Sequence, residues 1–318
     1  MAHYLVTGGC GFIGSHLCDA LLEQGNEVRI LDNLSSGHRE NAPPRAELMI
    51  GDVADRVAVR DAIREVDGVF HLAAVASVER SNDDWVGTHV TNLTGCITVF
   101  DAARNLRGDG PVPVVYASSA AVYGLNERVP VVEDDVAQPM TAYGADKLGC
   151  ELHARIASSI HGVPTVGLRF FNVYGPRQDP SSPYSGVISI FCERLMSGSP
   201  LTIYGDGEQV RDFIHVSDVV RLTMKAMTTP MAGGEVFNVC TGQGISVRQL
   251  GEIIAKLCQI SPDLIYRDPR PGDVRMSVGD SSRAFRQFGV RARMPLAEGL
   301  NDTLAAARER QVLQRRYA

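Results

Sequence analysis

The feature that most constrains the fold is a glycine-rich turn near the N-terminus, made by Gly8, Gly11 and Gly14. Residues 4–7 before it form a short apolar run, and apolar residues recur at helical spacing over residues 12–22 after it. This order predicts a strand, a tight turn and a helix. Glycine has no Cβ atom, so it allows the tight turn and lets the backbone approach a phosphate group. Because a helix N-terminus attracts anions, the turn is a candidate phosphate-binding site.

Acidic residues follow the next two strand-like runs, over residues 27–31 and 47–50. Asp32 lies 18 residues after Gly14, where a carboxylate accepts hydrogen bonds from an adenosine ribose and repels a 2′-phosphate. The turn and this carboxylate together favour NAD over NADP. Asp52 has two interpretations: it hydrogen-bonds the adenine amino group, or it caps a helical stretch after Val53.

The following residues continue the alternation of strands and helices. Apolar runs at residues 68–72, 112–117 and 165–170 predict further strands, and residues 87–106 and 143–160 predict helices. The strands are apolar throughout instead of alternating with polar residues, which indicates a parallel sheet covered on both faces. We therefore expect an α/β fold with a Rossmann-type doubly wound parallel sheet.

The composition changes after about residue 174, where a Pro/Ser/Gly-rich loop covers residues 176–186. Shorter elements follow, and two apolar runs, at residues 213–216 and 236–240, are predicted to return to the main sheet. We expect a dinucleotide-binding domain made of residues 1–174 plus about 213–242. Residues of about 175–212 plus 243–318 are expected to form a smaller C-terminal α/β lobe that binds the substrate.

The charge and the cysteine pattern narrow the class of protein. The formal net charge of -6, without a Lys/Arg cluster, makes nucleic acid an unexpected partner. The seven cysteines are widely spaced and form no CxxC pair, which favours reduced thiols in a cytoplasm over disulfides or a metal site. The chain starts without a charged leader, and no apolar run approaches the about 20 residues of a membrane span, so neither secretion nor a membrane is expected.

Tyr143 and Lys147 are four residues apart on a predicted helix and therefore face the same side. A nearby ammonium favours the phenolate form of tyrosine, which suits an acid/base. An isolated pair of this kind is more often solvated, but the upstream segment YASSAAVYG places serine hydroxyls at the end of a predicted strand, where ligands of open α/β sheets bind. Ser119 is expected to hydrogen-bond the reacting oxygen, and Ser118 to cap the backbone at the strand end.

Seven segments in order along the chain carry a family resemblance: TGGCGFIG, LDNLSSG, HLAA, YASSAAVYG, YGADK, RFFNVYGPRQDP and GDGEQVRDFIHV. This set resembles the extended short-chain dehydrogenases, and most closely the UDP-sugar 4-epimerases. The resemblance covers nearly the whole chain, and it supplies the substrate class, a UDP-sugar, with NAD as cofactor. One departure is Ala76, which stands where some galactose epimerases carry a lysine, so the tightness of NAD retention stays open.

The resemblance implies a role for each residue that matches the family's motifs. The implied catalytic residues are Ser119, Tyr143 and Lys147. The implied NAD-binding residues are Gly8, Gly11, Phe12, Ile13, Gly14, Asp32, Asn33, Asp52, Val53, Leu72, Ala73, Ala74, Asn92, Tyr143 and Lys147. The implied substrate-binding residues are Ser77, Ser119, Asn172, Val187, Tyr204, Arg211, Arg270, Asp273 and Ser277. Two arginines suit a diphosphate, and Tyr204 suits the face of a uracil ring.

Ala120 and Ala121 distinguish between the reactions of the family. The 4,6-dehydratases carry an Asp-Glu pair there and UDP-glucuronate decarboxylases tend to keep a glutamate, whereas alanine performs no acid/base chemistry. The resemblance therefore implies 4-epimerisation: Tyr143 takes the proton of the 4-hydroxyl while NAD accepts hydride from C4, and the 4-keto sugar turns over before hydride returns. Epimerisation of UDP-glucuronate stays open. A non-catalytic nucleotide-sugar binder is disfavoured by the intact catalytic residues.

Two further expectations follow from the resemblance. The position four residues after the aspartate of Arg-x-Gly-Asp acts as a gate beside the C2 substituent of the sugar, and here it is Ser277. Its small side chain predicts interconversion of UDP-GlcNAc and UDP-GalNAc, together with UDP-Glc and UDP-Gal. The helices over residues 87–106 and 143–160 are expected to pair across a two-fold axis as a four-helix bundle, which gives a homodimer.

Overall fold

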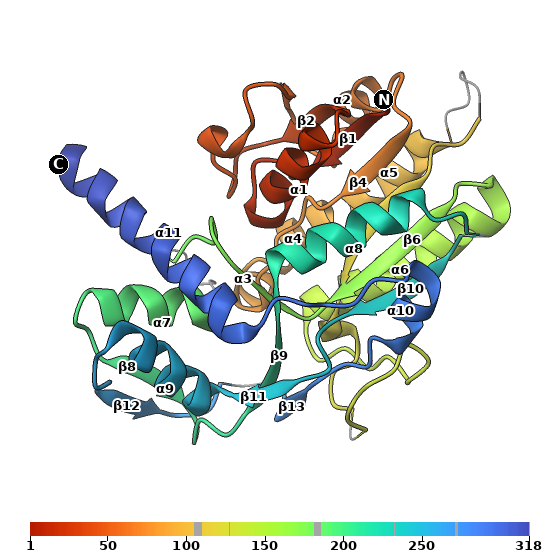
Figure 1. Cartoon of the computed structure of the whole chain (residues 1–318). Helices are drawn as coiled ribbons and strands as arrows, with labels where there is room; N and C mark the ends of the chain where they lie inside the picture. The colour runs from red at the N-terminus through yellow and green to blue at the C-terminus, as the bar shows by residue number, and fades with distance from the viewer. Residues whose placement is uncertain (105–109, 127, 181–185, 232, 271–272, 318) are drawn as a thin grey trace.

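A computed structural model describes residues 1–104, 110–126, 128–180, 186–231, 233–270 and 273–317. Its centre is a parallel sheet of seven strands in the order β10-β6-β5-β4-β1-β2-β3 (Figure 1). The strands are β1 (His3–Thr7), β2 (Glu27–Asp32), β3 (Glu47–Ile50), β4 (Gly68–His71), β5 (Val114–Ser119), β6 (Thr165–Phe170) and β10 (Glu235–Val239). The doubly wound parallel sheet predicted from the sequence is confirmed.

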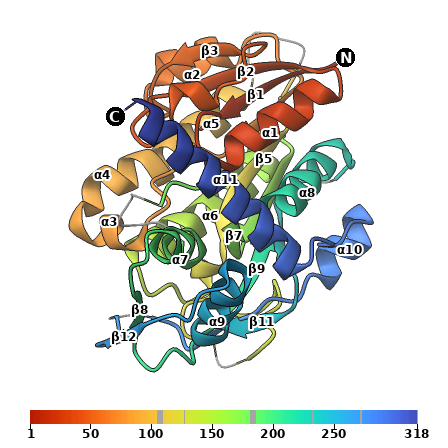
Figure 2. The same cartoon turned by 60° about the vertical axis from the view of Figure 1, so that its left-hand side comes forward.

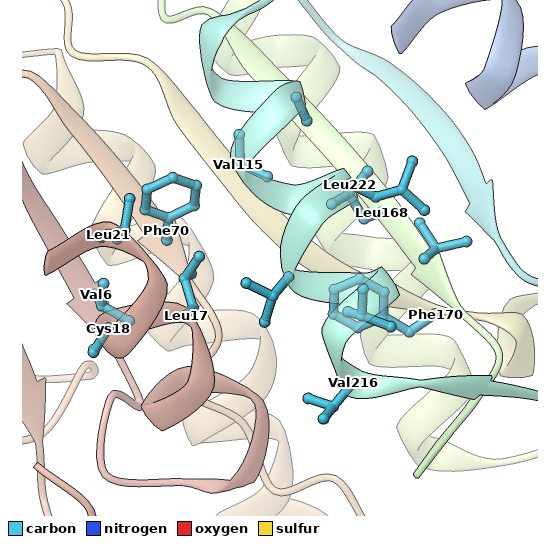
Figure 3. Close-up of a cluster of buried hydrophobic side chains, with 14 of the residues drawn as sticks. Val6, Leu17, Cys18, Leu21, Phe70, Val115, Leu168, Phe170, Val216 and Leu222 are labelled. Carbon is cyan, nitrogen blue, oxygen red and sulfur yellow. The ribbon is translucent and has the colours of Figure 1, made fainter. Parts of the chain in front are cut away.

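Helices cover both faces of this sheet, which explains why its strands are apolar at consecutive positions. Val6 belongs to the core formed with α1 (Phe12–Glu23), α8 (Val216–Thr228) and α10 (Ser282–Phe288), whereas Leu5 belongs to the core on the opposite face. The second face is covered by α2 (Arg56–Ala62), α5 (Gly95–Ala103) and α6 (Ala142–His161). Figure 3 shows the first core, in which Leu17 and Leu21 of α1 lie with Phe70 and Val6 of the sheet. Because successive side chains of a strand point to opposite faces, both sets are buried.

The two predicted helices near the middle of the chain differ in regularity. Helix α6 begins after Thr141, whose side chain accepts a hydrogen bond from the Gly144 amide at 3.1 Å, and ends at Gly162 in a left-handed conformation. The helix predicted over residues 87–106 is divided into α4 (Trp85–His89), the π-helical segment η2 (Val90–Thr94) and α5. Its predicted end at Leu106 lies outside the described residues.

A smaller lobe lies at the opposite end of the molecule from β1, β2 and β3 (Figure 2). Its core contains Phe191, Leu201 and Leu250, all buried. Its strands are β7 (Asn172–Tyr174), β9 (Val210–His215), β11 (Gly244–Ser246) and β13 (Met276–Ser277) in one sheet, and β8 (Leu201–Tyr204) with β12 (Leu264–Arg267) in another. Its helices are α7 (Val187–Met196), α9 (Val247–Cys258) and α11 (Leu296–Tyr317). Residues 176–180 of the predicted loop are irregular, and residues 181–185 lie outside the described part of the chain.

One predicted strand position is wrong. Residues 236–240 return to the main sheet as expected, since β10 pairs with β6, but residues 213–216 do not. Strand β9 instead pairs with β7, β11 and β13, and helix α8 returns to the main sheet directly after it. The reason is that Phe213 packs in the core of the small lobe while Ile214 packs in the core of the main sheet. The apolar run therefore contributes side chains to two cores, although its sequence pattern resembles that of a strand buried in a single core.

Among the helices that the structure describes, none has both the length and the apolar composition needed to cross a membrane.

Candidate active site

A cleft of about 720 Å³ opens at the carboxyl ends of the main sheet's strands. In parallel sheets all strands present these ends on one edge, so segments distant in sequence meet there. The cleft is lined by the glycine turn after β1, residues 31–38 after β2, residues 72–77 after β4, residues 117–119 of β5, and Tyr143 and Lys147 of α6.

The glycine turn is built so that only glycine fits at two of its positions. Gly8 has a φ of 72°, and a Cβ atom on it would lie 2.7 Å from the amide nitrogen of Ala73. A Cβ atom on Gly14 would collide with the carbonyl oxygen of Gly8. Helix α1 starts after Gly11, which has no side chain to cap it, so the first N–H groups of the helix are available to an anion.

Asp32 ends β2 and is only 7% exposed, and its carboxylate is fixed by two hydrogen bonds. Its Oδ2 accepts a hydrogen bond from the Cys10 amide at 2.9 Å, and its Oδ1 accepts one from the Leu34 amide at 2.8 Å. These bonds orient the carboxylate beside the glycine turn in the same cleft. A pyrophosphate cradle next to an oriented carboxylate fits the dinucleotide NAD, because the two parts match its pyrophosphate and its adenosine ribose.

Two of the predicted cofactor residues, Asp52 and Asn92, do not line the cleft. Oδ2 of Asp52 accepts a hydrogen bond from Asn33 at 2.8 Å, and Asn33 is in the cleft. The alternative that Asp52 caps the next helix is wrong, because α2 is capped by Asp55. Asn92 is buried and bonds both the amide and the carbonyl of Val75, at 2.8 and 3.2 Å, so it holds the segment after β4 that lines the cleft. The other predicted cofactor residues line the cleft directly.

The three predicted catalytic residues meet in the cleft. Tyr143 lies in the first turn of α6, and the Lys147 ammonium, one turn later, is 5.8 Å from the centre of its ring. The Lys147 side chain is buried, and its Nζ donates a hydrogen bond to the carbonyl of Ala117 at 2.9 Å. Ser119 ends β5. The geometry therefore places a hydroxyl, a phenol and an ammonium around one space, and their catalytic roles stay predictions.

The two neighbouring serines, Ser118 and Ser119, hydrogen-bond different groups. Ser119 caps the backbone, since its Oγ accepts a hydrogen bond from the Ala121 amide at 3.1 Å. The expectation that Ser118 would cap the strand end is wrong: its buried hydroxyl donates to Oε1 of Glu151 at 2.6 Å.

A buried histidine, His71, lies directly before the cleft residue Leu72. His71 ends β4, and its Nδ1 hydrogen-bonds the Thr7 hydroxyl at 2.8 Å. Burial and, to a smaller extent, the charge of Lys147 lower the pKa of His71 to about 3. The imidazole is therefore neutral at any ordinary working pH and serves as a hydrogen-bonding group.

Two of the predicted substrate residues, Ser77 and Ser119, line the cleft. Ser77 also caps α3 (Val78–Asp83) by accepting a hydrogen bond from the Arg80 amide at 3.0 Å. Val187 opens α7 directly after Gly186, which lines the cleft.

The other predicted substrate residues belong to the small lobe and are not among the residues that line the cleft. Several of them contact one another: Arg211 pairs with Asp273, and Ser277 lies opposite Arg211 in the β9–β13 register. The guanidinium of Arg270 lies 4.2 Å above the ring of Tyr204. Asn172 donates to the carbonyl of Asp212 at 3.2 Å, between β7 and β9.

Arg270 links this group to the cleft. Its Nη1 lies 3.1 Å from Oε1 of Glu79 in α3, the helix that carries the cleft residue Arg80. The group on the small lobe therefore lies next to the mouth of the cleft.

Sequence reasoning missed several cleft residues. Leu34, Ser35, Ser36, Gly37 and His38 line it. Their signal was present, because they directly follow Asp32 and Asn33 in the segment LDNLSSG. The further lining residues Arg80, Thr91, Gln178 and Asp179 come from other elements, and only the packing of those elements brings them to the cleft.

Comparisons with known proteins identify the family of the chain. The family model of the NAD dependent epimerase/dehydratase family matches residues 4–240. The UDP-glucose 4-epimerase of Mycolicibacterium smegmatis is 37% identical over 308 residues, 94% of this chain and 96% of that protein. The structure of the UDP-glucose 4-epimerase of Thermotoga maritima with UDP-glucose is similar with a TM-score of 0.92 and 36% identity, over 97% of this chain and 99% of that chain.

A relative with another substrate is equally similar. The UDP-N-acetylglucosamine 4-epimerase of Methanobrevibacter ruminantium, solved with UDP-N-acetylmuramic acid, has a TM-score of 0.91 and 35% identity, over 97% of this chain and 99% of that chain. The fold, the NAD cradle and these similarities lead to one conclusion: the chain belongs to the NAD-dependent epimerase/dehydratase family, and its similarity within that family is to UDP-sugar 4-epimerases.

Proposed function

We propose that this protein is an NAD-dependent UDP-hexose 4-epimerase that interconverts UDP-GlcNAc and UDP-GalNAc, and also UDP-Glc and UDP-Gal. The observation that supports epimerisation is the meeting of Ser119, Tyr143 and Lys147 in the cleft that holds the dinucleotide cradle. Ala120 and Ala121 follow Ser119 directly, so the positions used for elimination in the dehydratases carry no acid or base.

Each residue has a chemical task in this proposal. NAD, when bound, would supply the acceptor for the hydride of C4 and the donor that returns it to the other face of the sugar, which gives the C4 epimer. Tyr143 removes the proton of the 4-hydroxyl and gives it back, and the buried ammonium of Lys147 lies one helical turn away, 5.8 Å from the centre of its ring. The Ala117 carbonyl fixes the ammonium, and Ser119 holds the sugar oxygen by a hydrogen bond.

The small side chain of Ser277 supports the proposed specificity for N-acetylated sugars. This residue is half-buried in β13 and lies opposite Arg211, one of the residues proposed to hold the UDP group. A serine at this gate leaves volume for an N-acetyl group, whereas a tyrosine fills it. Exclusion of volume rejects a larger substrate more strongly than an open pocket rejects a smaller one.

The test is an assay of five substrates with wild type and Ser277→Tyr. We expect the wild type to epimerise UDP-GlcNAc, UDP-GalNAc, UDP-Glc and UDP-Gal, and the variant to lose the acetylated pair selectively, by about two decades in kcat/KM. Ser197→Tyr, at an exposed position after α7, is the matched control. Activity confined to UDP-Glc and UDP-Gal would refute the gate and leave epimerisation intact. No epimerisation of any sugar would refute both.

UDP-glucuronate is the second candidate substrate, and it is the fifth compound of the assay. The observation that favours it is Arg80, whose positive charge lines the cleft near Ser77 and attracts a carboxylate at C6 of the sugar. If UDP-glucuronate is turned over in preference to the four UDP-hexoses, UDP-glucuronate is the substrate.

We also propose that the protein is a homodimer and works in the cytoplasm. The homodimer is proposed because α4 and α6 expose apolar side chains, among them Trp85 and Ile156. The cytoplasm is proposed because all seven cysteines are unpaired, six of them buried, as expected for a reducing compartment.

A further inference from the structure

A buried ion pair lies directly behind the proposed catalytic residues. Arg169 of β6 and Glu151 of α6 are 2% and 0% exposed, and two parallel hydrogen bonds of 2.8 Å join the guanidinium to the carboxylate. Burial lowers the pKa of Arg169, but the hydrogen bonds and the charge of Glu151 outweigh it and raise the pKa overall, so the guanidinium is charged. A buried ion pair is seldom more stable than well-packed apolar residues, so its presence points to a task other than stability.

The carboxylate of this pair also holds the strand that carries Ser119. Oε1 of Glu151 accepts a hydrogen bond from the Ser118 hydroxyl at 2.6 Å. The neighbouring carbonyl of Ala117 accepts a hydrogen bond from Lys147 at 2.9 Å. The two residues before Ser119 are therefore both fastened to α6.

The fastening residues share one face of that helix with the proposed acid/base. Tyr143, Lys147 and Glu151 follow one another at intervals of four residues, so their side chains form a stripe along α6. The first residue of the stripe lines the cleft, and the next two hold the end of β5.

The arginine of the pair is held from the other side. Its Nη1 donates to the hydroxyl of Tyr123 at 2.9 Å and to the carbonyl of Glu133 at 3.0 Å, and Tyr123 donates in turn to Asn238 of β10 at 2.6 Å. Buried groups of the described residues therefore hold the guanidinium from both sides.

We propose that Ser118, Glu151 and Arg169 are positioning residues, which set the separation of the Ser119 hydroxyl from the Tyr143 phenol by clamping the end of β5 to α6. The inference rests on the proposed catalytic roles of Ser119 and Tyr143. Its physical basis is that a small misplacement of reacting groups lowers the rate steeply while substrate binding elsewhere is unaffected.

The test removes the clamp at its mildest point. In Ser118→Ala the ion pair remains, and we expect kcat to fall by about one to two decades with KM and NAD content within about twofold of wild type. Ser118→Thr keeps the hydroxyl and is expected to restore kcat to within a factor of about three. The control is Thr223→Ala, which removes an equally buried hydroxyl that donates to Val219 within α8 at 2.7 Å, away from the cleft. It should reduce thermal stability and leave kcat unchanged.

The outcomes separate this inference from the proposed function. Wild-type kcat in Ser118→Ala, failure of Ser118→Thr to restore it, or an equal loss in Thr223→Ala would each overturn the positioning role. Tyr143→Phe is measured in the same assay. If Tyr143→Phe is inactive while Ser118→Ala behaves like the control, only the positioning inference fails. If Tyr143→Phe retains activity, the proposed catalytic role fails and the inference falls with it.

Discussion

At the scale of single residues, the proposed chemistry depends on one hydroxyl group. Tyr143→Phe removes this hydroxyl and keeps the ring that lies against Lys147 in the cleft. We expect kcat to fall by about two to four decades, the usual effect of losing a positioned acid/base, with circular dichroism and NAD content unchanged. Tyr266→Phe, at an exposed position of β12, is the matched control and should retain full activity. Near-wild-type turnover of Tyr143→Phe would refute the assignment.

At the scale of elements, α4 and α6 expose apolar side chains on adjoining surfaces. Trp85 and Val86 begin α4 and are 67% and 76% exposed, and Leu152, Ile156 and Ile160 recur every four residues on α6. This spacing gives an apolar stripe on the side of α6 opposite its buried residues. An exposed stripe of this kind marks a protein interface, which supports the proposed two-fold four-helix packing.

The dimer is tested by placing a charge in that stripe. We expect the wild type to scatter light as a dimer at micromolar concentration and Ile156→Glu to be a monomer, because a two-fold axis buries each substituted residue twice. Val136→Glu, at a position that is 69% exposed and outside both helices, is the control and should stay dimeric. A wild-type monomer, or a dimer of Ile156→Glu, would contradict the proposal.

At the scale of the whole molecule, buried histidines determine how the fold responds to acid. Burial lowers the pKa of His16, His71 and His215, which lie in α1, β4 and β9, and the pKa of His71 falls to about 3. The unfolded chain binds these protons below about pH 6.5, whereas the fold excludes them. The contribution of these histidines to stability is therefore fully present above about pH 6.5 and is lost as the pH falls.

The measurement is the free energy of unfolding between pH 7 and pH 5. His71 alone is expected to contribute a loss of about 1.4 kcal/mol per pH unit below pH 6.5, or about 2 kcal/mol at pH 5. In His71→Asn the loss of unfolding free energy per pH unit should be smaller by about 1.4 kcal/mol. His161 is an exposed residue of α6, so His161→Asn should keep the wild-type slope. Buried carboxylates with a raised pKa, such as Glu133, act in the opposite direction, and the comparison of variants cancels them. Equal slopes in all three proteins would contradict the prediction.

The sequence by itself determined the main sheet, the cofactor turn and the residues expected to carry the chemistry. Each of these depends on short-range patterns: continuous apolar runs give buried parallel strands, a glycine spacing gives the turn, and a four-residue interval places Tyr143 and Lys147 on one helix face. Local physics decides such features, because neighbours in sequence remain neighbours in the fold.

Only the tertiary structure decided where apolar or polar side chains with more than one possible partner would go. Strand β9 lies outside the main sheet because Phe213 and Ile214 pack in different cores. Both cores require apolar residues, so the sequence does not show which core each side chain enters. Ser118 bonds Glu151, 33 residues away, instead of the backbone beside it. A serine hydroxyl can hydrogen-bond either the nearby backbone or a distant side chain. Which of the two lies within hydrogen-bond distance depends on tertiary packing, and no local sequence pattern contains that information.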